Sequence, residues 1–199
     1  MDLLALWTTL VQKLSGKDAE KWYAAITAFL RKENPWEAVA KVVGDVVKHL
    51  LDLDADPHCP NGLTVAKDGH RKMGKDIPLE RRGEDLYLGG KKLVFHLSER
   101  QMNGKTIQGF ELREELAGKE VLNANVLDYL LAHQELIPES WKRDECGNVR
   151  FIYFWGTVYR VSHGYLYVRC LFWHDVGWHR HDSWLGYDWP SHEPAVLAS

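Results

Sequence analysis

The stretch from Val149 to Leu185 constrains the fold most, because it contains three β-patterned runs separated by short turns. The run up to Val161 is rich in β-branched and aromatic residues, which favour strands. Gly156 interrupts this run and predicts a bulge or a sharp bend. Two further runs follow, Tyr165 to Trp173 and then Trp178 to Leu185. Short connections between consecutive strands predict an antiparallel β-meander at the C-terminus.

Aromatic side chains gather in this same stretch, because six of the 9 Trp residues lie after residue 140. Strand alternation places the rings and arginines of the second run on one face, next to those of the third run. Flat rings and guanidinium groups on one surface stack well against bases or sugar rings. The predicted ligand-binding residues are therefore Tyr165, Tyr167, Arg169, Trp173, Trp178, Arg180 and Trp184. The alternative is that the N-terminal helices cover this face and that its rings belong to the core.

Histidines in the same stretch suggest an alternative metal site. His179 and His181 are two positions apart on a predicted strand, so both imidazoles point to the same side. A third ligand, His174, would come from the preceding turn. No ligand spacing such as H-E-x-x-H is present. We therefore predict no cofactor, with zinc only under the alternative interpretation.

The N-terminal residues 1–53 have apolar side chains at helical spacing in three stretches. The first begins near Leu3 and ends before Gly16. Asp18 is a candidate N-cap for the second, and Asn34-Pro35 is a strong start signal for the third, which runs to Leu51. These patterns predict a helical unit of three helices packed on one another.

Residues 54–83 lack any period and are punctuated by Pro, Gly and Asn-Gly, so they are interpreted as a linker or loop. Residues 84–199 then form an α+β domain. A hairpin is expected around Gly89-Gly90, followed by short helices at residues 110–117 and 126–133. The predicted fold class is α+β: an N-terminal three-helix unit, then a hairpin, two short helices and the Trp- and His-rich antiparallel β-meander.

Net charge and cysteine content indicate which cellular compartment and which partners to expect. The chain has 25 Lys and Arg against 28 Asp and Glu, a net charge of -3 that gives no general attraction to nucleic acid or anionic membranes. Cys59, Cys146 and Cys170 are odd in number and far apart, which fits reduced thiols. No apolar run reaches the ~18 residues that a membrane span requires. The first residues also lack signal-peptide features. We therefore expect a cytoplasmic protein without a membrane partner.

Several segments of the C-terminal half have long and unusual sequences. They are GKEVLNANVLDYLL (118–131), IPESWK (137–142), FWGTVYR (154–160) and LYVRCL (166–171), followed by the Trp-rich end. In these segments, and over about residues 85–199, the chain resembles a family of uncharacterised bacterial proteins. The resemblance implies a bacterial, cytoplasmic origin and assigns no functional residue.

Two functions of different classes are consistent with these patterns. The leading hypothesis is a non-catalytic binding or interaction protein that uses the aromatic and Arg face. Its partner would be a protein, a single-stranded nucleic acid or a glycan. The alternative is a metal-dependent hydrolase built on the three histidines. A structural protein whose N-terminal helices assemble with another chain is a third hypothesis.

Overall fold

The computed structural model describes residues 15–17, 19–30, 49–60 and 62–199. The chain divides into two compact units, Met1–Val47 and Lys48–Ser199. In the first unit, helix α2 (Ala19–Leu30) is described. The hydroxyl of Thr27 donates to the carbonyl of Tyr23 one turn earlier, at 2.8 Å. A helix therefore forms where the sequence predicts the second one.

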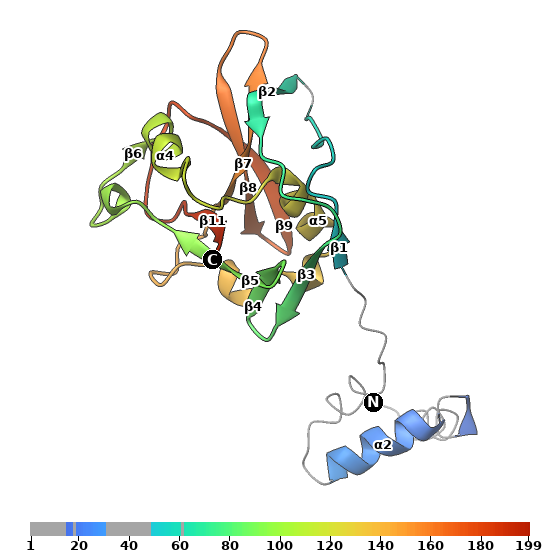
Figure 1. Ribbon diagram of the computed structural model, residues 1–199. Helices are drawn as coiled ribbons and strands as arrows, with labels where there is room; N and C mark the ends of the chain where they lie inside the picture. Colours follow the sequence, from blue (N-terminus) through green and yellow to red (C-terminus); the bar gives the residue numbers. More distant parts are fainter. Residues whose placement is uncertain (1–14, 18, 31–48, 61) are drawn as a thin grey trace. The chain divides into compact units, whose positions relative to one another are not determined.

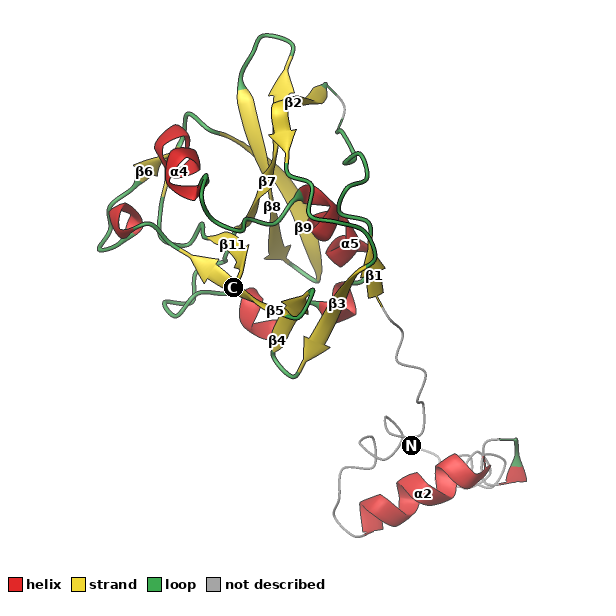
Figure 2. Cartoon of the chain, viewed as in Figure 1, coloured by secondary structure: helices red, strands yellow, loops and turns green. Residues whose placement is uncertain are grey.

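The second unit is built around one large sheet, which dominates Figures 1 and 2. Its strands run in the order β1-β3-β4-β5-β11-β7-β8-β9, with β2 paired to β7. Neighbours are antiparallel except β11 and β7, which are parallel. The sheet strands are β1 (His49–Leu51), β2 (Leu63–His70), β3 (Ile77–Arg82), β4 (Asp85–Leu88), β5 (Lys91–His96), β7 (Ile152–Val161), β8 (Leu166–His174), β9 (Gly177–Trp184) and β11 (Ala195–Ala198).

The remaining elements of this unit are short. Strands β6 (Ile107–Gln108) and β10 (Asp188–Trp189) pair with each other in a small second sheet. The helices are α4 (Gly109–Leu116) and α5 (Ala124–Ala132). Three single 3-10 turns cover Glu99–Gln101, Gln134–Leu136 and Glu139–Trp141.

The large sheet is covered on both faces, so its central strands are buried on both sides. On β7, Phe154 faces a core that contains apolar residues of α5, and Trp155 faces a second core that contains residues of α4. The same alternation divides Leu171 from Cys170 on β8. We call the α5 side of β7, β8 and β9 the α5 face and the opposite side the α4 face. Burial on both faces explains why β7 is apolar at nearly every position.

Gly156 allows β7 to approach the segment that leads into α5. A Cβ added at Gly156 would lie 2.8 Å from the backbone atoms of Leu122 and Asn123, which is closer than a real side chain permits. The Gly156 N–H also donates to the Leu122 carbonyl at 2.8 Å. The pairing of β7 with β8 shifts register between Tyr153 and Val158, as the glycine predicts.

The predicted fold class is wrong. The structure is mostly β-sheet, and the described residues contain only three helices, all of them short. No N-terminal three-helix unit is seen, because the end of the third predicted helix forms strand β1, which pairs with β3. Its earlier residues, 36–48, and the first predicted helix lie outside the described residues, as does the predicted cap Asp18. Residues 54–83, expected to be a linker or loop, contribute strands β2 and β3 to the sheet.

Individual elements of residues 84–199 do occur where the sequence predicts them. Strands β4 and β5 form a hairpin in which Gly89 and Gly90 both adopt positive φ, at 58° and 82°. Helices α4 and α5 lie within one or two residues of their predicted starts. Strands β7, β8 and β9 pair consecutively and antiparallel, as the short turns require.

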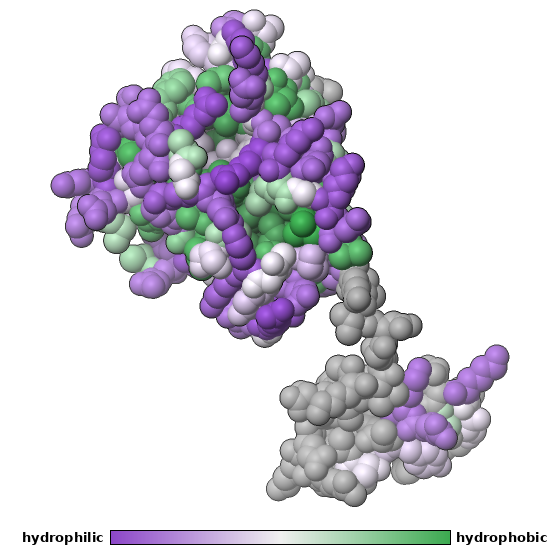
Figure 3. All heavy atoms as spheres, viewed as in Figure 1, coloured by the Kyte–Doolittle hydropathy of each residue, from purple (hydrophilic) through white to green (hydrophobic). Residues whose placement is uncertain are grey.

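Figure 3 shows the surface of the molecule from one side. Polar side chains cover most of the described surface in this view, with apolar atoms between them.

Candidate ligand-binding surface

The register of β8 and β9 brings the predicted aromatic and Arg residues onto one face. Tyr167 lies opposite Trp184, and Trp173 lies opposite Trp178. Between these pairs, Arg169 lies opposite Asp182, and Leu171 lies opposite Arg180. This is the α5 face, so the sheet itself brings the predicted residues together. Helix α5, from the C-terminal unit, covers its middle part.

Arg169 is at the centre of this face and is fully buried. Its guanidinium group donates two hydrogen bonds to the carboxylate of Asp128 on α5, at 3.1 Å (Nη1–Oδ2) and 3.0 Å (Nη2–Oδ1). It also donates to the hydroxyl of Tyr159 at 3.3 Å, and that hydroxyl donates to the His58 carbonyl at 3.1 Å. Asp182 lies 3.5 Å from Arg169 Nε on the remaining side. Arg169 Nε and Asp182 Oδ1 are buried without a hydrogen-bond partner, but both terminal nitrogens of the guanidinium group donate within the protein, so the arginine does not reach a ligand.

The electrostatics of this cluster keep Arg169 charged. Burial alone would lower the pKa of the guanidinium, but the hydrogen bond to Tyr159 and the nearby Asp128 carboxylate outweigh burial and raise that pKa. Burial also raises the pKa of the Tyr159 hydroxyl, which stays protonated. Arg180, which is exposed, approaches the same Asp128 oxygen at 3.5 Å. Because its partners are fixed, the cluster holds α5 against the sheet.

The end of the face near the β8–β9 turn is also used internally. Trp178 is 5% exposed and packs in the core with residues of α5. Its ring contacts Trp173 edge to face, at 5.6 Å between centroids. The ammonium group of Lys142 lies 3.5 Å from the centroid of the half-buried Trp173 ring. Of the predicted binding residues, Trp178 is thus in the core and Trp173 is covered by a lysine.

The opposite end of the face remains open and carries a row of rings. Tyr165 is 53% exposed and Tyr187 is 62% exposed. Trp184 lies between them in edge-to-face contacts, with centroids 5.3 Å from Tyr165 and 5.4 Å from Tyr187. We call Tyr165, Trp184 and Tyr187 the aromatic ridge. Tyr167, half-buried, lies opposite Trp184 in the strand pairing and supports it.

Gly186 fixes the position of the central ring of the aromatic ridge. A Cβ at Gly186 would lie 2.4 to 2.6 Å from the Trp184 indole, so only glycine allows the ring to lie there. The Tyr187 N–H then donates to the Trp184 carbonyl at 3.1 Å, which closes the turn after β9. The aromatic ridge therefore rests on a sheet and a tight turn, and its rings are oriented before any ligand arrives.

The three predicted metal ligands are exposed but do not form a ligand set. His174 Nδ1 lies 3.0 Å from the Asp175 carboxylate. The rings of His174 and His179 are 6.2 Å apart, and His181 lies opposite buried Cys170 on the next strand. Across the part of the chain that the structure describes, no three His, Cys, Asp or Glu side chains converge on one point. The geometry therefore gives no support to the hydrolase alternative.

Two residues of this surface, Tyr187 and Asp128, were not predicted from the sequence. Tyr187 lies beyond the third strand, past Gly186, where no strand period extends. Asp128 is the one acidic residue of the mostly apolar helix α5. A buried arginine requires a carboxylate partner, which is the one signal that could have found it. The positions of residues in the sequence do not indicate which of the 28 acidic residues pairs with Arg169.

Comparison of the chain with protein-family models, with curated proteins and with solved structures finds no match. The resemblance to a bacterial family therefore stays a prediction. None of the described helices has the length and apolar character needed to span a bilayer.

Proposed function

We propose that this protein is a non-catalytic binding protein that holds a neutral glycan chain on the aromatic ridge. The observation that carries the proposal is the exposure of Tyr165 and Tyr187 on either side of Trp184, in the connections just before β8 and just after β9. Exposed rings in a row are unusual at a surface without a ligand, because each leaves a large apolar area in water. The remaining predicted binding residues act as the support of this surface.

Sugar rings fit this surface because their C–H faces are apolar and flat enough to lie on an aromatic ring. Each such contact removes apolar area from water at about 25 cal/mol per Å². Neighbouring hydroxyl groups need polar partners at the edge of the rings. Asp182 lies two residues before Trp184 on the same face of β9, and Asp188 directly follows Tyr187. Because Oδ1 of Asp182 is buried against Arg169, the other oxygen of Asp182 and the exposed Asp188 carboxylate are the acceptors that would suit a polyol.

The charge around the aromatic ridge favours a glycan over a single-stranded nucleic acid. Binding of a nucleic acid depends on cations that neutralise phosphates. Here the central arginine, Arg169, is buried and paired with Asp128, and the chain carries a net charge of -3. The exposed Arg180 on the same face lies 3.5 Å from Asp128, so this cation also has an acidic partner. A phosphate backbone would therefore find few free cations here, whereas a neutral sugar chain needs hydrogen-bond acceptors.

The experiment is a binding screen of the full chain with two arms, neutral oligosaccharides on an array and single-stranded oligonucleotides at low salt. We expect saturable binding to a subset of neutral glycans and none to oligonucleotides. The Tyr165→Ala variant tests the site, and Val176→Ala in the β8–β9 turn is its control, since Val176 is 93% exposed at the other end of these strands. Oligonucleotide binding, or no glycan binding at all, contradicts the proposal.

A further inference from the structure

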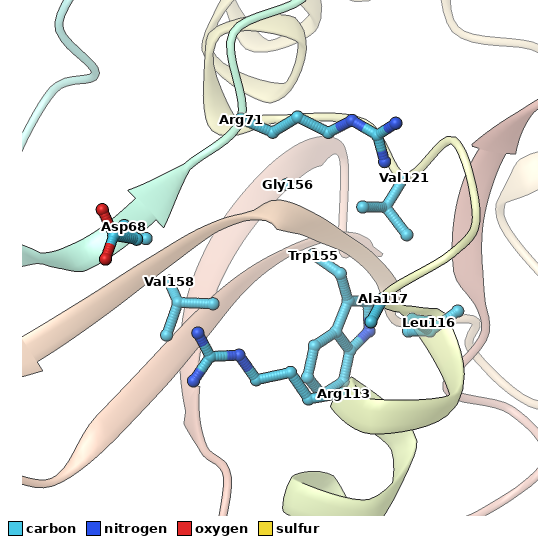
Figure 4. A pocket seen from close by; sticks show the side chains of 10 residues that line it. Asp68, Arg71, Arg113, Leu116, Ala117, Val121, Trp155, Gly156 and Val158 are labelled. Atoms are coloured by element: carbon cyan, nitrogen blue, oxygen red, sulfur yellow. The ribbon is translucent and has the colours of Figure 1, made fainter.

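The hollow between β2, β7 and α4 does not form a complete ligand site (Figure 4). Arg71 and Arg113 lie on either side of Trp155, and their guanidinium groups point away from each other. The lining residues Trp155, Leu116 and Val121 are buried. The hollow therefore offers neither a joint anion site nor an open apolar wall. The free edge of β9, at one end of the large sheet, supports a further inference instead.

Strand β9 is the last strand of the large sheet, because it pairs with β8 on one side and with no described strand on the other. The Leu185 N–H donates to the Leu166 carbonyl of β8 at 2.9 Å, and the register of the two strands is constant. The odd-numbered residues of β9 therefore turn their backbone groups toward β8, and the even-numbered residues turn theirs outward. His179, Arg180 and His181 are exposed, which leaves this edge open to solvent.

The protein itself closes both ends of this edge. At one end, the side-chain amide of Gln134 takes the place of a neighbouring strand. It accepts from the Trp178 N–H at 3.1 Å and donates to the Trp178 carbonyl at 3.5 Å. At the other end, the Trp184 carbonyl accepts from the turn that follows. Between these ends, the outward N–H and C=O groups of Arg180 and Asp182 have no hydrogen-bond partner among the described residues.

We propose that the edge of β9 pairs with the same edge of a second copy of this chain, antiparallel and with two-fold symmetry at His181. Arg180 then lies opposite Asp182 of the second copy, and Asp182 lies opposite its Arg180. Each of these pairs exchanges two backbone hydrogen bonds, and opposite charges directly across two strands are stabilising. A symmetric register moved to Arg180 or to Asp182 places like charges opposite each other, which is destabilising. Charge complementarity therefore selects the register at His181.

The charged groups of this pairing have capacity left for a second copy. Arg180 is exposed and approaches Asp128 with one nitrogen, at 3.5 Å, which leaves most of its five donors free. Asp182 is partly exposed although its Oδ1 is buried beside Arg169, so its other oxygen is the one available. That oxygen has lone pairs for both a sugar hydroxyl and an arginine. The aromatic ridge and Asp188 lie outside the paired residues, and the inference does not depend on glycan binding.

The first test is sedimentation equilibrium of the full chain over a range of concentrations. Because the pairing is short, we expect reversible dimers with a Kd on the order of 10–100 µM. Arg180→Gln removes both charge pairs between the copies and should raise this Kd about threefold or more. Arg180→Pro also removes an outward N–H, which an edge strand tolerates, and should abolish the dimers.

Arg160→Gln is the matched control, because it makes the same charge change at an exposed arginine of β7. It should dimerise like the wild type. A wild type that is monomeric at about 500 µM overturns the proposal. Wild-type dimerisation of both Arg180 variants also overturns it, since the copies would then associate elsewhere.

The second test measures the register by disulfide cross-linking. Cys59 and Cys146 are the exposed native cysteines, so both are first replaced by Ser. In the proposed register His181 lies opposite His181 of the second copy, in a non-hydrogen-bonded pair whose Cα atoms are about 4.5 Å apart, within reach of a disulfide. His181→Cys should therefore cross-link with oxidised glutathione, whereas His179→Cys, which lies opposite Ser183, should not. Any result other than cross-linking that favours His181→Cys overturns the proposal.

Discussion

Arg169 on β8 and Asp128 on α5 form a two-pronged ion pair, at 3.1 and 3.0 Å, that ties the helix to the middle of the sheet. The guanidinium group is fully buried, and Tyr159 and Asp182 complete its surroundings. The pair determines which part of the aromatic face is covered and which part stays open. Beyond it, toward Tyr165 and Trp184, the rings reach solvent.

The first prediction concerns this ion pair. Asp128→Asn keeps the shape of the side chain but removes the charge opposite a buried guanidinium group. Because breaking one half of a buried pair leaves an uncompensated charge, we expect the free energy of unfolding to fall by about 3–5 kcal/mol in urea. Asp175→Asn, at a 77% exposed carboxylate that faces His174, is the control and should change it by less than about 0.5 kcal/mol. Equal effects in the two variants would show that the pair does not hold α5.

The second prediction separates core rings from ridge rings. Trp178→Ala deletes a ring that is 5% exposed and should cost about 3–5 kcal/mol in urea unfolding. Trp184→Ala removes a half-buried ring whose N–H lacks an acceptor, so its cost should be about 1 kcal/mol. A large and equal loss in both variants would assign Trp184 to the core.

These two tryptophans show what the sequence can and cannot predict about the surface. Strand alternation correctly places both on one face of β9, because a period of two is a local property. Their different exposure depends on α5, which is nearly 50 residues earlier in the chain. Nothing local to Trp178 indicates that contact, so the sequence predicts the face but not its covering.

The fold-class error has a similar cause. The apolar positions up to Leu51 follow a helical period, yet His49–Leu51 pairs with β3 as a strand. Strand β2 includes Lys67, Asp68 and Gly69, which break any period, because a bulge places them. Partners that are remote in sequence therefore override the local signal in both places. The hairpin at Gly89-Gly90 was predictable because its turn chemistry is entirely local.

A third prediction concerns the close approach at Gly156. Gly156→Ala would place a Cβ 2.8 Å from backbone atoms of Leu122 and Asn123, which cannot move without shifting the start of α5. We expect a loss of about 1–3 kcal/mol in urea unfolding. Gly118→Ala is the matched control, because nothing lies within 4 Å of a Cβ there. A wild-type midpoint for Gly156→Ala would refute the approach of these two segments.

A fourth prediction follows from Glu193, where burial raises the pKa of the carboxyl group to about 7 from the ordinary 4.5. A raised carboxyl pKa stabilises the fold at low pH, and this contribution is lost as pH rises from 4.5 through 7. Glu193→Gln stays neutral, so its stability relative to the wild type should increase over that range by about 3 kcal/mol. Unfolding in urea at several pH values measures this difference. A difference that is constant with pH would exclude a raised pKa.

The most direct test of the proposed function is titration of Trp184→Ala with a neutral oligosaccharide that the wild type binds. Trp184 is the central ring of the aromatic ridge and contacts both of its neighbours. We predict that this variant stays folded and loses affinity by about tenfold or more, while Val176→Ala binds like the wild type. Wild-type affinity in a folded Trp184→Ala protein would contradict it.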